Sequence, residues 1–285
     1  MPTTKTHRLG SFRQRERMLQ AEQTELERAR KRLAKAKSVG DLEPHKKPGP
    51  KPDAITASVT LFVGACVGSF LFFANPFLQP FETYRLVNAV CLLWIPCVAI
   101  TVFLKQDLSD FGFTHGDRKF GLKFVFFAIL AMTPLLIIAS LQSAFRQYYG
   151  EMVSQPLAMV GYAVRAGWTP PVRPLGMLYY ELIQGFYFFC WEFFFRGFLL
   201  FGLARARYLS NFGAVIVQAS VFALLHWSIV PSASKPPAEI ATALAGGLIL
   251  GWLAVRTKTF FYGFLIHWSI SAILDILLVV SMLRM

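Results

Sequence analysis

The sequence predicts an all-α membrane protein: a polytopic transmembrane helix bundle of about seven spans, preceded by a basic cytoplasmic helix. Of its 285 residues, 55% are hydrophobic and only 16% are charged. The apolar residues, with 28 phenylalanines among them, come in long blocks. These blocks meet or approach the ~20 residues that an α-helix needs to cross a bilayer. The first 53 residues, in contrast, are polar.

Residues 1–53 form the first predicted domain, a basic tail. Residues 12–37 contain no Gly or Pro and are rich in Arg, Gln, Glu, Ala and Leu, which predicts a helix. Leucines repeat every seven residues there, but only one heptad position is filled. A helix near anionic lipid headgroups is therefore favoured over a coiled coil. Val39–Asp53 carries four prolines and is predicted to be a linker.

The formal net charge of +13 is explained if the chain is a membrane protein with basic cytoplasmic segments. The tail holds 14 Lys and Arg against 7 Asp and Glu, so 14 − 7 gives +7 of the total. Membrane proteins keep Lys and Arg in their cytoplasmic segments. We therefore expect an integral, multi-pass protein with a cytoplasmic N-terminus, and no nucleic-acid partner.

The second predicted domain, residues 54–285, carries the spans. The connection 143–175 contains four prolines and is expected to lie partly at the membrane interface. A re-entrant piece in this connection would raise the count to eight. Gly247 and Gly251 form a small-xxx-small pair that allows close helix packing. The predicted spans are 54–75, 84–104, 120–142, 176–204, 211–229, 239–256 and 259–283.

The four cysteines read as small buried hydrophobic residues. All of them lie in apolar spans, and no C-x-x-C pair occurs. The sequence therefore predicts neither a disulfide framework nor a cysteine zinc site.

The strongly polar side chains within the spans gather on three helices. All but one fall on 176–204, 211–229 and 259–283, whereas scattered residues would be spread over all seven spans. Ionisable groups at bilayer depth are costly, usually face the bundle interior and often mark functional sites. They are Glu181, Gln184, Glu192, Arg196, Gln218, His226, His267 and Asp275, with Glu239 at the edge of another span.

Two motifs within this set point to chemistry. Glu192 and Arg196 are four residues apart in an aromatic run, hence on one face of a helix. Two histidines lie in other spans, His226 four residues after Phe222, and His267. A carboxylate and an imidazole can draw a proton from one water, while a second imidazole and a hydroxyl donate to an oxyanion. A structural ion pair and interhelical hydrogen bonds are the alternatives.

These motifs resemble the CPBP family of intramembrane endopeptidases, which includes the type II CAAX prenyl proteases and bacteriocin-processing or self-immunity proteins. The family has E-E-x-x-x-R, F-x-x-x-H and H-x-x-x-N on successive core helices. Glu192 with Arg196, Phe222 with His226, and His267 match in order. The resemblance covers roughly 105–280, with its motif core at about 176–280, and implies that 54–285 is a CPBP-like protease domain.

The resemblance implies an intramembrane endopeptidase that hydrolyses a peptide bond of a membrane-associated substrate. Its expected partners are that peptide or protein substrate and the lipid bilayer. It further implies metal-free hydrolysis without a cofactor, although Glu192, His226 and His267 could in principle bind zinc. The expected roles are activation of water by Glu192 and His226, stabilisation of the oxyanion by His267 and Ser271, and orientation of Glu192 by Arg196.

Two positions depart from the family pattern. Trp191 stands where the family has its first glutamate, and Ser271 stands in place of the last asparagine. Glu192 must take over as the base, or the protein is a catalytically inactive family member that serves as a membrane scaffold or binding protein. A transporter that uses the same buried charges is a third alternative.

Overall fold

The computed structural model describes residues 20, 23–28, 30–31, 53–78, 81–143, 146, 172–206, 209–227 and 237–283. The chain divides into two compact units, Met1–Gly49 and Pro50–Met285. In the first unit the described residues are helical and exposed. The rest of the helix predicted at 12–37, residues 39–52 of the predicted linker and most of the connection 143–175 lie outside the described residues.

Every regular element that the structure describes in the second unit is helical, which confirms the all-α prediction. Three of these elements, η2, η3 and η5, are π-helical, and η1 and η4 are short 3₁₀-helices. In chain order the elements are α2 (Ala54–Ala74), η1 (Asn75–Phe77), α3 (Phe81–Ala89), η2 (Val90–Trp94), α4 (Ile95–Val98), η3 (Ala99–Phe103), η4 (Leu108–Phe111), α5 (Arg118–Leu141), α7 (Val172–Glu192), η5 (Phe193–Leu199), α8 (Leu200–Leu203), α9 (Asn211–Leu224), α10 (Pro237–Thr257) and α11 (Phe261–Leu283).

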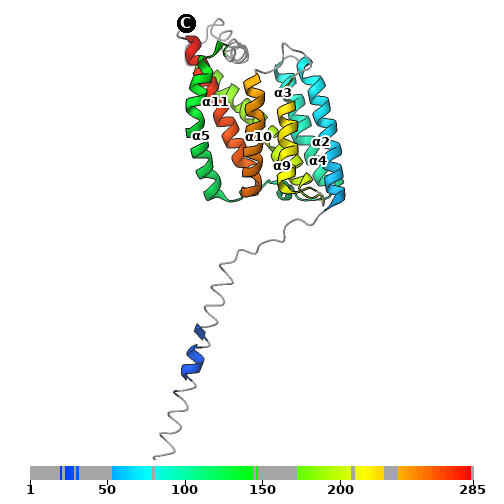
Figure 1. Cartoon of the computed structure of the whole chain (residues 1–285), viewed down its shortest axis with the longest axis vertical. Helices are drawn as coiled ribbons and strands as arrows, with labels where there is room; N and C mark the ends of the chain where they lie inside the picture. Colours follow the sequence, from blue (N-terminus) through cyan, green and yellow to red (C-terminus); the bar gives the residue numbers. More distant parts are fainter. Residues whose placement is uncertain are drawn as a thin grey trace, which may run out of the picture. The chain divides into compact units, whose positions relative to one another are not determined.

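Six helices among the described residues are long and apolar enough to cross a membrane. They stand side by side as an upright bundle (Figure 1). They correspond to six of the seven predicted spans, with ends that differ by a few residues. They run over Ala54–Phe77, Thr83–Phe103, Arg118–Leu141, Met177–Leu203, Glu239–Thr257 and Phe261–Val280.

The fifth predicted span, 211–229, is shorter than the sequence suggested. Its helix, α9, has 14 residues and ends at Leu224. At 1.5 Å per residue it is about 21 Å long, less than the ~30 Å thickness of the hydrocarbon layer. The backbone N–H of His226 bonds to the Ala223 carbonyl, an i to i−3 bond that tightens the last turn. The hydropathy of the sequence did not indicate that α9 ends at Leu224, because apolar residues continue beyond this position.

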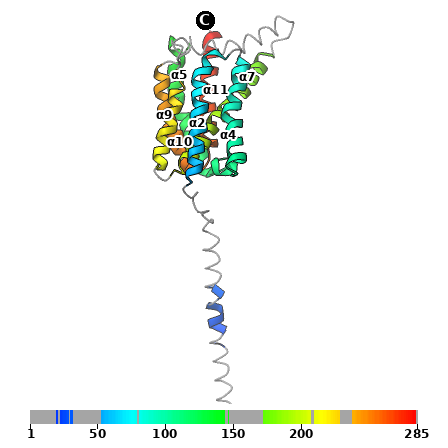
Figure 2. The same ribbon diagram turned by 90° about the vertical axis from the view of Figure 1, so that its right-hand side faces the viewer.

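Three close contacts position the helices around the polar residues. α10 packs against α9, and α11 packs against both α5 and α7 (Figures 1 and 2). At the first contact a Cβ on Gly247 would lie 2.9 Å from the Ala219 side chain. The Gln218 amide donates to the Gly247 carbonyl at 2.7 Å. The predicted small-residue pair thus permits the close approach expected of it.

A polar network joins three segments at one end of the bundle. Asp53 caps α2, and its backbone N–H donates to the Arg205 carbonyl at 3.0 Å. The Gln106 amide donates to the Asp53 carboxylate and accepts from the Arg205 guanidinium. Hydrogen bonds from Thr56, foremost that of its hydroxyl, lower the pKa of the Asp53 carboxyl. The start of α2 and the chain after α8 are therefore fixed at one level.

An aromatic core surrounds η5. Four of its phenylalanines are completely or almost completely buried, and the rings of Phe111 and Phe260 close around them. The two charged residues at this level, Glu192 and Arg196, are also fully buried. The fold thus encloses two charged groups in an apolar core, and such groups need partners.

Candidate active site

Glu192 is the last residue of α7, directly before the π-helical segment η5. Short π-helical segments inside α-helices occur often at functional sites. The Glu192 Oε1 atom lies 3.1 Å from a guanidinium nitrogen of Arg196. The contact predicted from the four-residue spacing is present, and both residues are inaccessible to solvent.

His267, on α11, provides the second partner of the same carboxylate oxygen. Its Nδ1 lies 2.8 Å from Glu192 Oε1. Beside an ionised carboxylate this nitrogen carries the proton and donates, so the neutral ring has its lone pair on Nε2. The Phe188 ring lies 4.3 Å from the imidazole, centroid to centroid. The His267 side chain is 24% exposed, whereas Glu192 behind it is fully buried.

His226 lies in the turn that follows α9. Its Nδ1 is 2.9 Å from the Phe222 carbonyl, one of the last carbonyls of that helix. A carbonyl only accepts hydrogen bonds, so Nδ1 donates and Nε2 of the neutral ring carries the lone pair. The imidazole therefore caps the end of α9 and has a defined tautomer.

The Phe222 ring contacts both imidazoles and the Arg196 guanidinium. Its centroid lies 4.7 Å from the His226 ring and 5.9 Å from the His267 ring. The Arg196 guanidinium carbon lies over the same ring at 4.2 Å, a cation–π contact. Helices that are distant in sequence thus bring four of the five predicted site residues together. The fifth, Ser271, lies one helical turn after His267 on α11 and is half-buried.

A glycine makes room for the second carboxylate oxygen. A Cβ added to Gly263, on α11, would lie 2.9 Å from Glu192 Oε2. This oxygen is buried and has no hydrogen-bond partner among the residues that the structure describes. Sequence analysis missed both Gly263 and Phe188. Each stands four residues before a site residue, His267 and Glu192 respectively, and this spacing was the available signal.

A second polar cluster lies on the same two helices, nearer the start of α7. The Trp268 indole donates to the Glu181 carboxylate at 3.3 Å, and the Glu181 side chain is also hydrogen-bonded to Asp275. On α3, the Arg85 guanidinium lies 3.8 Å above the Tyr187 ring and is buried. Buried polar residues are therefore not confined to three helices, as the sequence suggested, because α3 contributes to them.

A zinc centre takes its protein ligands from His, Cys, Asp and Glu side chains. Within the described ranges, no group of three or more His, Cys, Asp or Glu side chains could hold a metal ion. Glu192 Oε1 faces the Arg196 cation and the Nδ1–H of His267, and both disfavour a metal at that oxygen. A zinc ion is therefore disfavoured at Glu192 Oε1.

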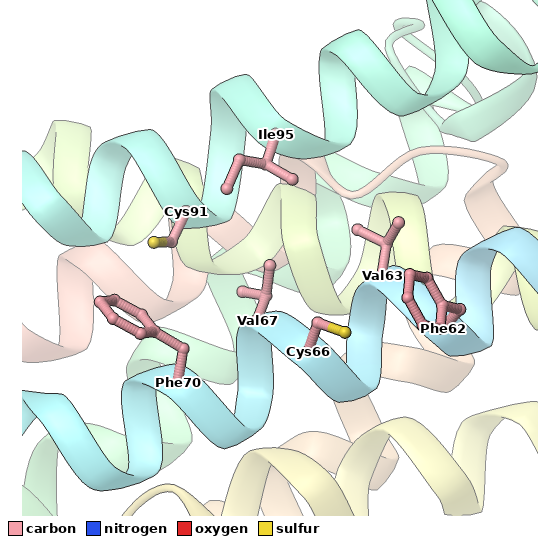
Figure 3. Close-up of a pocket in the computed structure, with 7 residues that line it drawn as sticks. All are labelled: Phe62, Val63, Cys66, Val67, Phe70, Cys91 and Ile95. Atoms are coloured by element: carbon pink, nitrogen blue, oxygen red, sulfur yellow. The ribbon is translucent and has the colours of Figure 1, made fainter.

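An apolar groove of about 430 Å³ opens between α2 and the η2–α4 segment (Figure 3). None of the predicted site residues lines it, so it is separate from the polar centre. Its lining consists of Phe62, Val63, Cys66, Val67, Phe70, Cys91 and Ile95.

Comparison with protein families shows what the chain is similar to. Residues 173–273 match the model of the type II CAAX prenyl endopeptidase Rce1-like family. Over this segment the chain is similar to that family. The segment contains all five predicted site residues and the helix contacts that join them. Comparisons with curated proteins and with solved structures found no match.

The Rce1-like segment supports the coarse functional prediction. Its family consists of membrane peptidases, and the described part of the chain has six helices that could span a membrane. The protein is therefore an integral, multi-pass membrane protein, and the match supports the interpretation as an intramembrane protease.

Proposed function

We propose that the protein is an intramembrane endopeptidase that hydrolyses a peptide bond of a membrane-associated substrate through a water activated by His267 and Glu192. The observation that supports this most strongly is the 2.8 Å contact between His267 Nδ1 and a buried carboxylate that also faces an arginine. A carboxylate behind an imidazole fixes its tautomer and stabilises the imidazolium that forms when the ring takes a proton.

The reaction follows from these positions. The water oxygen attacks the carbonyl carbon, and the water proton moves to His267 Nε2 as the C=O electron pair moves onto the oxygen. When the tetrahedral intermediate collapses, the C–N bond breaks and the nitrogen takes the proton from His267. Glu192 accepts the hydrogen bond from His267 Nδ1–H, and His226 Nε2 serves as a second acceptor for the water.

This proposal differs in one respect from the roles suggested by sequence. There, His267 was assigned to the oxyanion, and Glu192 itself acted on water. The hydrogen bond to Glu192 makes His267 the better base, because its accepting Nε2 is backed by a negative charge. Ser271 keeps its proposed role as a hydroxyl donor to the oxyanion.

The substrate is proposed from the chemistry of the surroundings and from the family description. A site within an apolar bundle suits a peptide that lies in or at the bilayer. The matching family is described as prenyl endopeptidases, so we propose a prenylated C-a-a-X peptide as the first probe. We further propose a bacterial inner-membrane location, a cytoplasmic N-terminus, contact of the N-terminal helix with anionic headgroups, and no cofactor.

The test uses the whole protein in lipid nanodiscs and a farnesylated C-a-a-X peptide that carries a fluorophore and a quencher. The same peptide without the farnesyl group shows whether the lipid is required. We expect cleavage by the wild-type protein and loss of cleavage in His267→Ala and His226→Ala variants that still fold. Intact cleavage by both variants would remove the catalytic role of the imidazoles, and no cleavage by the wild-type protein contradicts the proposed activity.

An inactive binding or scaffold protein is the second candidate, because of Trp191. The two candidates differ in the behaviour of Trp191→Glu. A native enzyme loses activity, since a second carboxylate near Arg196 would compete with Glu192 for its charge and would replace the indole among the aromatic rings. A scaffold protein gains activity only in this variant.

A further inference from the structure

The Trp191 indole is held in one orientation by four aromatic rings. It stacks on Phe195 at a centroid distance of 5.4 Å and an interplanar angle of 20°. Tyr187 lies at 5.7 Å on one side, and Phe222 meets it edge-on at 5.8 Å. The His226 imidazole lies at 6.3 Å, also edge-on. Packing of this kind fixes the direction of the indole N–H before any ligand binds.

The Nε1–H group of this indole lacks an acceptor. Trp191 is 6% exposed, and its Nε1 has no hydrogen-bond partner among the described residues. Most buried polar side-chain atoms in folded proteins are hydrogen-bonded, and each exception calls for an explanation. An indole N–H can only donate. The missing partner is therefore an acceptor atom beside the indole, whose ring lies 6.3 Å from that of His226.

The reaction requires such a donor. In their neutral forms both histidines use Nδ1–H to donate, to Glu192 and to the Phe222 carbonyl, so each Nε2 is an acceptor. The Arg196 guanidinium also has nitrogens without a hydrogen-bond partner among the described residues, but it is completely buried against Glu192, whereas Trp191 is 6% exposed. These groups can remove a proton from water, but negative charge that develops on a carbonyl oxygen needs N–H or O–H donors.

We propose that Trp191 Nε1–H donates a hydrogen bond to the carbonyl oxygen of the scissile peptide bond; this inference rests on the proposed function. As the water oxygen bonds to the carbonyl carbon, the C=O electron pair moves onto this oxygen, where the indole N–H and the Ser271 hydroxyl stabilise it. The water proton goes to His267, and no further reactant is needed. Trp191 is then a catalytic residue that contacts the substrate.

The kinetic test removes one N–H group and preserves the ring. In Trp191→3-benzothienylalanine, a sulfur atom replaces the indole N–H within a ring system of nearly the same shape. With the farnesylated C-a-a-X probe in nanodiscs, we expect kcat to fall roughly 10²-fold while KM stays within about threefold. The same replacement at Trp252, 49% exposed and packed on Phe120 and Phe124, is the control and should leave both constants unchanged. A kcat within twofold of wild type at position 191, or a change in KM alone, overturns the proposal.

A second measurement does not depend on turnover. The chain has six tryptophans, and the ¹⁵N-indole signal of Trp191 is assigned as the one lost in Trp191→Phe. In the Glu192→Gln protein, the probe peptide should move this signal downfield. A peptide in which a methylene group replaces the carbonyl group of the prenylated cysteine should leave the Trp191 signal unchanged.

The combined outcomes separate this inference from the proposed function. If the wild-type protein does not cleave but the carbonyl-bearing peptide moves the Trp191 signal, the activity is wrong and the donor assignment stands. If the protein cleaves and neither kcat nor the signal responds at position 191, the activity stands and the donor assignment is wrong. If there is no cleavage and no shift, both are wrong.

Discussion

Glu181 and Glu192 lie on the same helix, and each is contacted by a residue of α11, yet their surroundings differ. Glu192 meets a guanidinium and an imidazole. Glu181 meets an indole N–H and a second carboxyl group, that of Asp275. A hydrogen bond between two carboxyl groups requires a proton on one of them, whereas a guanidinium favours an ionised carboxylate. The two residues are of the same type and lie on the same helix. Their contacts therefore decide which of the two glutamates can assist a catalytic histidine.

Replacing each glutamate by glutamine should give the largest difference in kcat between the Glu192 cluster and the Glu181 cluster. We expect Glu192→Gln to lower kcat on the farnesylated probe roughly 10³- to 10⁴-fold, because an amide neither fixes the His267 tautomer nor stabilises the imidazolium. The kcat of Glu181→Gln should stay within about threefold of the wild-type value. The partners of Glu181 are the indole N–H of Trp268 and the carboxyl group of Asp275, and neither has a role in the proposed reaction. Equal losses in the two variants would mean that the clusters act as one unit.

A smaller effect is expected from crowding the Glu192 carboxylate. In Gly263→Ala the new methyl group meets Glu192 Oε2 at 2.9 Å, closer than atoms pack, so the carboxylate must move relative to His267. We expect kcat to fall roughly tenfold, in line with the sensitivity of catalysis to misplacement. Gly246→Ala is the matched control on α10, because a Cβ there meets nothing within 4 Å. The idea fails if both alanine variants behave alike.

The second cluster should affect stability more than rate. Trp268→Phe removes the N–H that Glu181 accepts and leaves part of the space above Gly185 empty. Loss of that donor should lower the free energy of unfolding by about 1–3 kcal/mol, with kcat nearly unchanged. Unfolding in mixed micelles at increasing SDS, followed by circular dichroism, measures the stability. A loss of rate with intact stability would contradict this division of roles.

No effect is expected from removal of metal ions. The charge of Glu192 is balanced by Arg196, and the described residues offer no set of metal ligands. Dialysis against EDTA, followed by the cleavage assay, should therefore leave kcat unchanged. Loss of activity that zinc restores would show that Glu192 has a different partner in the working enzyme.

The sequence predicted much of the fold, because hydropathy reports which segments lie in hydrocarbon. Six spans and the contact between Glu192 and Arg196 follow from block length and from the four-residue spacing. The sequence did not predict which histidine forms the hydrogen bond with Glu192, since this depends on how α11 is rotated relative to α7. The burial of Arg85 was also missed, because a cation near the end of a span reads as a loop residue.

The shortness of α9 has a consequence for how the bundle sits in lipid. Its first residues follow Arg205, which shares a level with the start of α2, so its other end stops about 9 Å short of the opposite boundary of a ~30 Å layer. His226, at that end, therefore lies inside the thickness of the membrane. Thin bilayers would reduce this mismatch and thick ones would increase it. The length of the surrounding lipid tails thus becomes a control on how readily water reaches the imidazoles.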